Sequence, residues 1–262
     1  MKLQILVSAV KEDAKKLAEK MNLQAESIII NQCGENNYEE FEFQGNKIRC
    51  YHFAEKGVGL SRNNALLRAK GDLCLFSDED IVYDNGAAEK IVEAFRRHPE
   101  ADMLLFNVRV CDDRRTYWTE KYHPVKWYNC GRYPAYSFAL RTRKMQEKNL
   151  TYSLYFGGGA KYANGEDSLF ISDCLKAGLK VYAIPVEIGE EVPRPSTWFQ
   201  GYDEKFFHDR GVLYHVLYQW LAMPMGLRFL LKNKSEMCSG SIGYKQARTL
   251  LFSGIRDAKK GL

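Results

Sequence analysis

Short apolar runs alternate with amphipathic stretches along the first 110 residues. The apolar runs predict buried β-strands, because apolar residues on both faces are typical of strands covered on both sides. The amphipathic stretches predict helices, because their apolar residues recur at helical spacing. The expected strands are Leu3–Ala9, Ser27–Asn31, Lys47–Phe53, Leu73–Ser77 and Met103–Val110, and the expected helices are Lys11–Met21, Ser61–Ala69 and Gly86–Arg97.

This alternation of strands and helices predicts an α/β fold, with a mostly parallel sheet flanked by helices. Ligands bind such sheets beyond the carboxyl ends of the strands. Four expected strands end in polar or glycine-containing segments, at Ser8–Val10, Asn31–Gln32, Phe53–Gly59 and Asp78–Asp80. We therefore expect these segments to border one binding site.

The pattern is less regular elsewhere. Cys111–Pro134 is rich in charged and aromatic residues without clean periodicity, which indicates a long excursion over the surface. Beyond Pro193 the chain becomes aromatic and basic, and we expect helices to its end. Polar loops are expected at Gly34–Glu40 and Leu154–Gly165, strands at Ala135–Arg141 and Val181–Ile184, and a helix at Glu166–Ala177.

Composition places the chain among ordinary globular proteins. Of its 262 residues 45% are hydrophobic and 13% aromatic, and the formal net charge is +5. That mild positive charge fits phosphate-bearing ligands or an anionic membrane surface, but does not by itself predict nucleic-acid binding. The seven cysteines include no C-x-x-C pair, which argues against a zinc site and for a reducing, cytoplasmic compartment. We expect no signal peptide and no membrane-spanning helix.

Three acidic residues, Asp78, Glu79 and Asp80, follow the expected strand Leu73–Ser77. In an extended chain Asp78 and Asp80 point the same way, because side chains alternate between the two faces. Two like charges on one face favour a divalent cation between them, and carboxylate oxygens suit Mg²⁺ or Mn²⁺. A solvated acidic turn is the alternative interpretation of this short motif.

Two further segments hold candidate functional residues. Gly57–Ala65 is a glycine-containing loop that leads into a helix, where Arg62 and the helix N-terminus both favour an anion. Glu166 and Asp167 open a helix after a glycine-rich loop. Either these acids only stabilise the start of the helix, or one of them is a general base beside the acidic site.

The order of these segments resembles the inverting family-2 glycosyltransferases of the GT-A fold, over roughly Leu3–Ile188. The family pattern is a helix with Arg-Asn, a small residue and A-x-G, then a strand that ends in D-x-D, and later an acidic pair followed by an apolar helix and a Gly-x-Lys turn. The three blocks occur here in that order, at Gly59–Asp72, at Phe76–Asp80, and at Asn164–Asp167 with Leu169 and Gly178–Val181.

The resemblance implies a GT-A catalytic domain over residues 1–190, with a nucleotide-sugar donor half (1–110) and an acceptor half (111–190), and a helical extension over 191–262. It implies inverting transfer of a sugar from a nucleoside-diphosphate sugar, with UDP-sugars favoured, to a hydroxyl group. The implied acceptor is a glycan or a lipid-linked glycan in surface-polysaccharide or glycan synthesis, and no nucleic-acid partner is expected.

The resemblance also implies roles for individual residues. Asp80 is the expected ligand of Mn²⁺ or Mg²⁺, with Asp78 beside it facing the nucleoside, and Asp167 is the expected catalytic base, with Glu166 as its neighbour. The residues that fall in the family's donor pocket are Ser8, Val10, Asn31 and Arg62. The chain departs from the family pattern where its first strand ends in Ser8-Ala9-Val10-Lys11 instead of Pro-x-Tyr-Asn, and where Asn31-Gln32 follows the second strand, so the nucleotide stays open.

The C-terminal region allows two interpretations. Its aromatic segment Trp198–Gly211 could close over the acceptor, and His208 within it could complete the metal site or be a packed residue. The basic residues that follow suit peripheral contact with the cytoplasmic face of a membrane, or belong to helices packed on the sheet domain.

Two other functions compete with glycosyl transfer. A nucleotidyltransferase that makes sugar nucleotides would carry a Gly-rich, basic loop after its first strand, and Val10–Asp13 lacks one. A non-catalytic carbohydrate- or nucleic-acid-binding protein could use the aromatic and basic segment Tyr117–Tyr136, but this leaves the acidic motifs unexplained.

Overall fold

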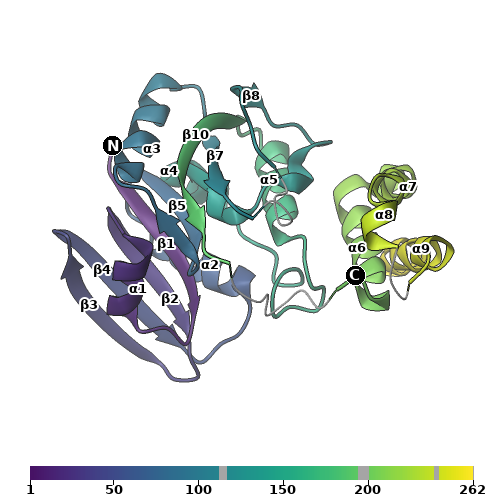
Figure 1. Cartoon of the computed structure of the whole chain (residues 1–262), viewed down its shortest axis with the longest axis horizontal. Coiled ribbons are helices and arrows are strands. Elements are labelled where there is room, and N and C mark those ends of the chain that lie inside the picture. Colours follow the sequence, from purple (N-terminus) through teal and green to yellow (C-terminus); the bar gives the residue numbers. More distant parts are fainter. Residues whose placement is uncertain (112–116, 194–200, 239–241, 262) are drawn as a thin grey trace.

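The computed structural model describes residues 1–111, 117–193, 201–238 and 242–261, and Trp198–Gln200 of the aromatic segment lie outside these ranges. Within these ranges ten strands form one open, mixed and mostly parallel sheet, with helices on both faces and further helices beside it (Figure 1). The strand order is β3-β4-β2-β1-β5-β9-β7-β10-β6, and β8 pairs with β10. The expected α/β class, with C-terminal helices, is confirmed.

The first half of the chain builds one side of the sheet. Strands β4 (Asn46–Phe53), β2 (Glu26–Gln32), β1 (Leu3–Val10) and β5 (Leu73–Asp78) run parallel, and β3 (Asn37–Phe43) pairs antiparallel with β4 at the edge. Their alternate residues supply two cores. One core lies under α1 (Ala14–Met21) and α3 (Ala87–Arg97), and the other lies under α2 (Val58–Arg68).

The second half of the chain completes the sheet. Strand β9 (Phe138–Arg141) lies between β5 and β7 (Met103–Arg109) and is antiparallel to both. Strand β10 (Val181–Glu191) runs parallel to β7 and pairs antiparallel with β6 (Ile81–Tyr83) and β8 (His123–Pro124). Helices α4 (Thr142–Glu147) and α5 (Glu166–Lys176) lie on the α2 face, and 3₁₀ turns η2 (Cys130–Arg132) and η3 (Ala135–Ser137) precede β9.

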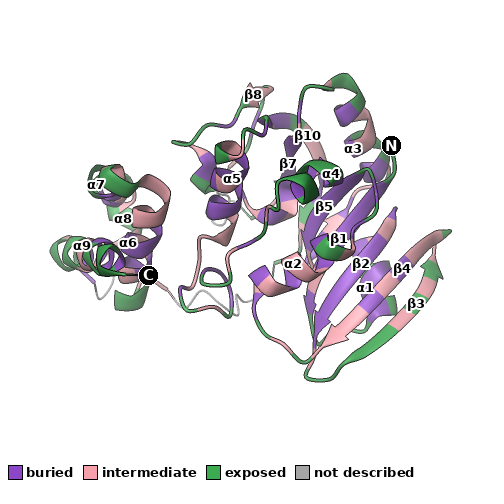
Figure 2. Ribbon diagram, turned by 180° about the vertical axis from the view of Figure 1, so that it is seen from behind, coloured by how far each residue is buried: buried purple, intermediate pink, exposed green. Residues whose placement is uncertain are grey.

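The C-terminal helices form a separate apolar cluster beside the sheet (Figures 1 and 2). They are α6 (Glu204–Tyr218), η4 (Gln219–Leu221), α7 (Ala222–Lys232), α8 (Lys234–Met237) and α9 (Tyr244–Lys260). Leu213 of α6 contacts Gly165 just before α5, and Asp209 accepts a hydrogen bond from the Ala163 backbone at 3.1 Å. The extension therefore packs against the loop that leads into α5. No helix within the described ranges is long and apolar enough to cross a membrane.

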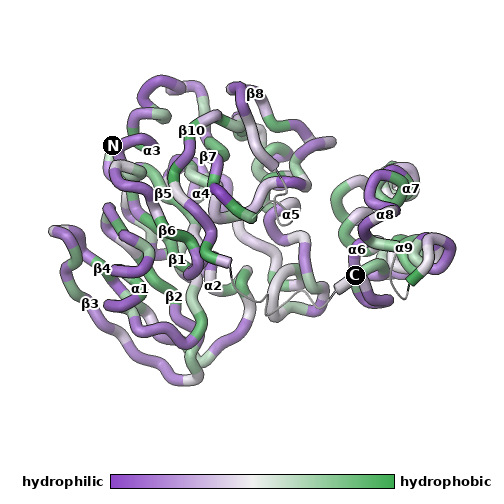
Figure 3. Tube along the Cα trace, viewed as in Figure 1, coloured by the Kyte–Doolittle hydropathy of each residue, from purple (hydrophilic) through white to green (hydrophobic). Residues whose placement is uncertain are grey.

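Three sequence expectations are wrong in detail. Gly34–Glu40 is not simply a loop, because β3 begins at Asn37; its exposed glutamates make this edge strand mostly hydrophilic (Figure 3). The strand expected at Val181–Ile184 continues to Glu191 past Pro185, because irregularities in its pairing with β7 accommodate the proline. The strand expected at Ala135–Arg141 begins with η3, so only Phe138–Arg141 is extended.

Candidate active site

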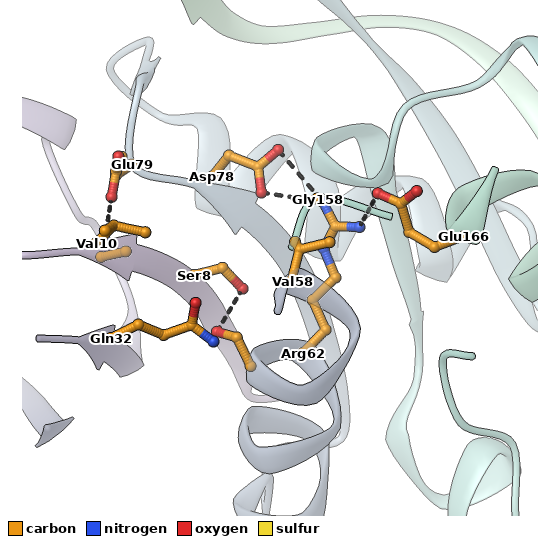
Figure 4. A pocket seen from close by; sticks show the side chains of 11 residues that line it. Ser8, Val10, Gln32, Val58, Arg62, Asp78, Glu79, Gly158 and Glu166 are labelled. Carbon is orange, nitrogen blue, oxygen red and sulfur yellow. Dashed lines mark hydrogen bonds and ion pairs between the residues drawn. The ribbon is translucent and has the colours of Figure 1, made fainter. Parts of the chain in front are cut away.

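A pocket of about 150 Å³ opens at the carboxyl ends of β1, β2 and β5, where the sequence placed a site (Figure 4). The start of α2 and the glycine loop before α5 close its other side. Its lining includes Ser8, Val10, Arg62 and Asp78 from the expected donor residues, and Glu166 from the expected acidic pair. The strand ends expected to converge therefore do so at β1, β2 and β5.

Arg62 is the centre of this pocket. Its side chain is only 4% exposed, and its Nη1 atom donates to Asp167 Oδ1 at 2.7 Å and to Glu166 Oε1 at 3.3 Å. Its Nη2 atom donates to Asp78 Oδ1 at 3.0 Å (Figure 4). One guanidinium thus faces three carboxylates. Burial lowers the pKa of Arg62, but Asp167 and Asp78 more than offset this, so its pKa lies above the ordinary value and the group stays charged.

Tyr152 and Asn63 hold Arg62 in place. The guanidinium lies 5.1 Å from the centre of the buried Tyr152 ring, which stacks on Phe170 of α5. Asn63 donates to the Tyr152 carbonyl at 2.9 Å and accepts from the Tyr152 backbone N–H at 2.7 Å. The two adjacent residues of α2 therefore have different roles. Arg62 binds the acids, and Asn63 fixes the position of the Tyr152 ring that Arg62 contacts.

Asp167 has the environment of a base that works near neutral pH. Its Oδ2 atom accepts from the Ala135 backbone N–H at 3.0 Å, so this bond and the one from Arg62 fix both carboxylate oxygens. Burial raises the pKa of Asp167 to about 7, against the lowering effect of Arg62, and the nearby charges of Glu166 and Asp78 raise it further. The start of a helix lowers the pKa of an acid, because it stabilises the ionised form. At Asp167 burial has the larger effect, so the pKa is raised.

Two glycine segments bring these groups together. The Val58 N–H donates to the Gly158 carbonyl at 2.9 Å, which joins the start of α2 to the loop before α5. A Cβ atom on Gly157 would lie 2.8 Å from Glu166 Cδ, and the φ of Gly157 is +106°. A side chain at this position would displace Glu166 from the pocket, so glycine is required there.

The acidic turn after β5 differs from the extended geometry that the sequence suggested. Strand β5 ends at Asp78, and Glu79 and Asp80 form a turn before β6. Glu79 accepts from the Val10 backbone N–H, which ties the turn to the end of β1 (Figure 4). The Asp80 side chain is largely buried, and its carbonyl accepts from the Val192 N–H at 2.8 Å. Asp78 and Asp80 therefore do not lie on one strand, and the prediction that strand geometry points their side chains the same way is wrong.

Four expected site residues do not line this pocket: Asn31, Asp80, Asp167 and His208. Of these, Asp167 still contacts Arg62, which does line it. Asn31 is buried and holds the loop after β1, through bonds with the Glu12 N–H at 3.1 Å and with its carbonyl. His208 lies on α6, where its Nε2 atom is 3.2 Å from Asp257 of α9. In this conformation His208 therefore belongs to the packing of the C-terminal helices.

One other group of potential metal ligands occurs within the described ranges, formed by Glu39, Cys50 and His52. Their donor atoms lie within 4.8 Å of one another on β3 and β4. Burial and the charge of Glu39 raise the pKa of Cys50 to about 12, so this thiol is protonated at neutral pH. The group shares no residue with the pocket.

Gln32 and Ser61 also line the pocket, although neither of them was assigned an individual role there from the sequence. Gln32 donates to the Gly57 carbonyl at 2.9 Å, and Ser61 donates to Ser8 Oγ at 2.9 Å. Helix α2 begins three residues before Ser61, at Val58. Two features of the sequence could have indicated these residues. One is the polar pair Asn31-Gln32, whose second residue lines the pocket, and the other is the glycine before α2.

Solved structures with this arrangement of sheet and helices share the GT-A-type fold. The S. aureus protein TarS (residues 1–349), in complex with UDP-GlcNAc, matches with a TM-score of 0.66 at 13% identity, over 98% of this chain and 80% of that one. A mannosyltransferase from Pyrobaculum calidifontis, PcManGT, in complex with GDP-Man and Mn²⁺, matches with a TM-score of 0.54 at 11% identity, over 98% of this chain and 87% of that one.

The sequence identifies the family. The model of glycosyl transferase family 2 matches residues 15–165. This range is more than half of the 262 residues, and the chain belongs to that family. No curated protein matches the sequence.

Proposed function

We propose that this family-2 glycosyltransferase is a metal-dependent, inverting enzyme. It moves a sugar from a nucleoside-diphosphate sugar, with UDP-sugars favoured, to a hydroxyl group of a growing glycan or polysaccharide. The observation that carries the proposal is the convergence of Asp78, Glu166 and Asp167 on buried Arg62 at the carboxyl edge of the sheet. The nucleotide-sugar complexes of TarS and PcManGT support a donor of this class.

Asp167 is the proposed catalytic base. Arg62 and the Ala135 N–H fix the orientation of its carboxylate, and burial raises its pKa to about 7, near the pH at which a base must act. It accepts the proton of the acceptor hydroxyl as that oxygen attacks the anomeric carbon of the donor. Attack from the face opposite the leaving nucleoside diphosphate inverts the configuration.

Asp78 at the end of β5 and Asp80 in the turn after it are the proposed metal ligands. The pocket offers oxygen donors, and its three carboxylates around one guanidinium leave an excess of negative charge that a hard divalent cation would balance. Asp78 and Asp80 would hold Mn²⁺ or Mg²⁺, which would offset the charge of the leaving diphosphate when bound. Ser8, Val10 and Gln32 line the side of the pocket proposed for the nucleoside.

An exposed apolar stripe supports the proposed contact with the cytoplasmic face of a membrane. Trp220 is 81% exposed and Leu231 59%, and Met223 and Leu227 lie between them at helical spacing on the outer side of α7. An amphipathic helix with an apolar stripe and flanking basic residues is suited to the interface of an anionic bilayer. A lipid-linked acceptor would be presented at that surface.

The Asp167→Asn variant tests the proposed base. We expect the rate of sugar transfer to fall by about 10²–10⁴-fold, while the affinity for the nucleoside diphosphate changes little, because the variant keeps the shape of the side chain but cannot take the proton. Asp173→Asn is the matched control, because Asp173 lies on the same helix, pairs with Lys176 at the surface and is 48% exposed. An Asp167→Asn enzyme with an unchanged rate would rule out this base.

A further inference from the structure

A second pocket, of about 190 Å³, lies between the sheet domain and the C-terminal helices. Four cationic side chains line it: Arg132 from η2, Arg210 from α6, and Arg228 and Lys232 from α7. None of the described residues that line it is acidic. No ion pair joins Arg210, Arg228 or Lys232 to a carboxylate within the described ranges. Such an accumulation of uncompensated positive charge favours an anion.

Arg210 is the most constrained of these cations. Its guanidinium lies between two rings, 5.2 Å from the centre of Phe206 and 5.1 Å from that of Phe229. Its Nε atom is buried and has no hydrogen-bond partner within the described ranges. Burial lowers the pKa of Arg210, in contrast to Arg62, whose acidic partners raise it. An arginine held this way keeps its charge and lacks the anionic partner that a buried guanidinium normally has.

Ser168 relates this pocket to the helix that carries the proposed catalytic base. Ser168 lines the pocket and follows Asp167 directly in α5. A Cβ atom on Gly131 would lie 3.6 Å from Ser168 Oγ and 3.9 Å from the Tyr218 hydroxyl, so η2, α5 and α6 meet at this point. The start of α5 therefore contributes to both pockets, because Glu166 lines the first pocket and Ser168 lines this one.

The two faces of α7 separate this pocket from the apolar stripe. Met225, Arg228, Phe229 and Lys232 line the pocket, while Met223, Leu227 and Leu231 belong to the exposed stripe. At about 100° per residue these sets lie on different sides of the helix. The pocket cations face the sheet domain, which favours a ligand at the active site over the headgroups of a bilayer beneath α7.

We propose that this pocket binds a phosphate group of the acceptor, so that the enzyme glycosylates a phosphate-bearing alcohol. The inference rests on the proposed function and names the class of its acceptor. Arginine recognises phosphate through paired hydrogen bonds, and three of the four cations are arginines. Tyr128, Tyr214 and Tyr218 line the same pocket and offer ring faces and hydroxyls to the sugar or polyol part of the acceptor.

Binding of inorganic phosphate and of glycerol 3-phosphate to the full chain tests the proposal, with glycerol as the uncharged control. The test variant is Arg228→Gln with Lys232→Gln, at exposed positions where folding tolerates the change. The matched control is Lys16→Gln with Lys20→Gln, which removes the same charge from the exposed side of α1. Calorimetry at constant ionic strength measures the affinities, and thermal unfolding confirms that both variants fold.

We expect both phosphate ligands to bind about tenfold or more weakly to the Arg228 and Lys232 variant, because it loses two charge-assisted contacts, and within about twofold of the parent to the control. Equal affinities of parent and test variant would overturn the proposal. Flotation with anionic vesicles provides a second test. Loss of flotation in the test variant, with unchanged affinity for soluble phosphate, would assign these cations to lipid headgroups instead.

Release of nucleoside diphosphate from sugar nucleotides by the unaltered chain measures the proposed function separately. Failure of this reaction, together with the expected difference in phosphate affinity, would remove the glycosyl-transfer mechanism and leave an anion site. Release of the diphosphate without any difference in phosphate affinity would retain the mechanism and remove the phosphate-bearing acceptor.

Discussion

Arg62 has an energetic role that follows from its three acidic partners. Without the guanidinium, Asp78, Glu166 and Asp167 would face one another in a partly buried pocket with no balancing charge. Breaking a buried charge pair by removing one partner typically costs about 3–5 kcal/mol, because the remaining charge is left unpaired. The residue that helps to assemble the site is therefore also needed for the stability of the fold around it.

The Arg62→Met variant tests this role. We expect its free energy of unfolding at pH 7 to fall by about 3–5 kcal/mol, and part of the loss to be recovered in acid as the unpaired carboxylates take up protons. Arg68→Met is the control on the same helix, because Arg68 lies over the rings of Tyr51 and Phe53 and not against acids. Urea denaturation at several pH values measures the difference. A loss independent of pH would show that lost packing, and not charge, is responsible.

The raised pKa of Asp167, the proposed base, predicts how the reaction rate depends on pH. Its pKa is raised to about 7, and only the ionised form accepts a proton, so kcat/KM should rise about tenfold per pH unit below pH 7 and level off above it. The same shift means that the folded state binds a proton which the unfolded state has lost between about pH 4 and 7, so this group makes stability fall as pH rises through that window. A profile without an acid limb, or a limb that persists in Asp167→Asn, would contradict the assignment.

At the scale of elements, helices α6 and α9 approach each other through glycine. A Cβ atom on Gly211 would lie 2.0 Å from the Leu251 carbonyl oxygen, and one on Gly254 would lie 2.0 Å from that of His208. Backbone atoms cannot move aside as a flexible side chain can. The two helices therefore pack at a distance that only glycine permits at these positions.

The Gly211→Ala variant tests whether the clash between the helices outweighs the higher helix propensity of alanine. Propensity alone would stabilise the variant by about 1 kcal/mol, whereas overpacking typically costs about 1–3 kcal/mol and can cost more against backbone. We expect the clash to dominate and the free energy of unfolding to fall. Gly243→Ala is the control, because its φ is −76° and nothing lies within 4 Å of the added Cβ atom. A Gly211→Ala variant more stable than the parent would show that the helices can separate without cost.

The elements that the sequence predicted well are those whose pattern reflects burial. Strands β1, β2 and β5 are apolar on both faces, and the helices between them have one apolar side. Strand β3 was missed because an edge strand tolerates polar residues, and its glutamates resemble a loop. The three-residue strand β6 is too short for periodicity, and Pro185 concealed the length of β10.

The sequence predicted only part of the membership of the candidate pocket, and none of its contacts. The motifs around Arg62, Asp78 and the Glu166-Asp167 pair indicated which residues belong together. The pairing of one guanidinium with three acids depends on how α2, β5 and α5 meet, and these elements are distant in sequence. The pocket with Arg210 was not visible either, because basic residues spread along a helical segment do not show which face they share.

At the scale of the whole molecule, the C-terminal helices are joined to the sheet domain by an apolar cluster and by polar contacts. Phe156, Tyr162 and Leu169 pack against Val212 and Leu213 of α6. Because Leu213 also contacts Gly165, a shift of α6 would change the packing around Gly165, the residue before Glu166. The proposed phosphate pocket lies along this junction, so a bound ligand would hold the two parts together.

The position of β9 at the middle of the sheet affects how the protein can be made. A ribosome delivers β5 well before Phe138–Arg141, the segment that must lie against it. During this interval the nascent sheet has one open side, to which a strand from another molecule could attach. Pairing with Phe138–Arg141 covers this side of β5, so the side stays open until the long segment between β7 and β9 has been synthesised.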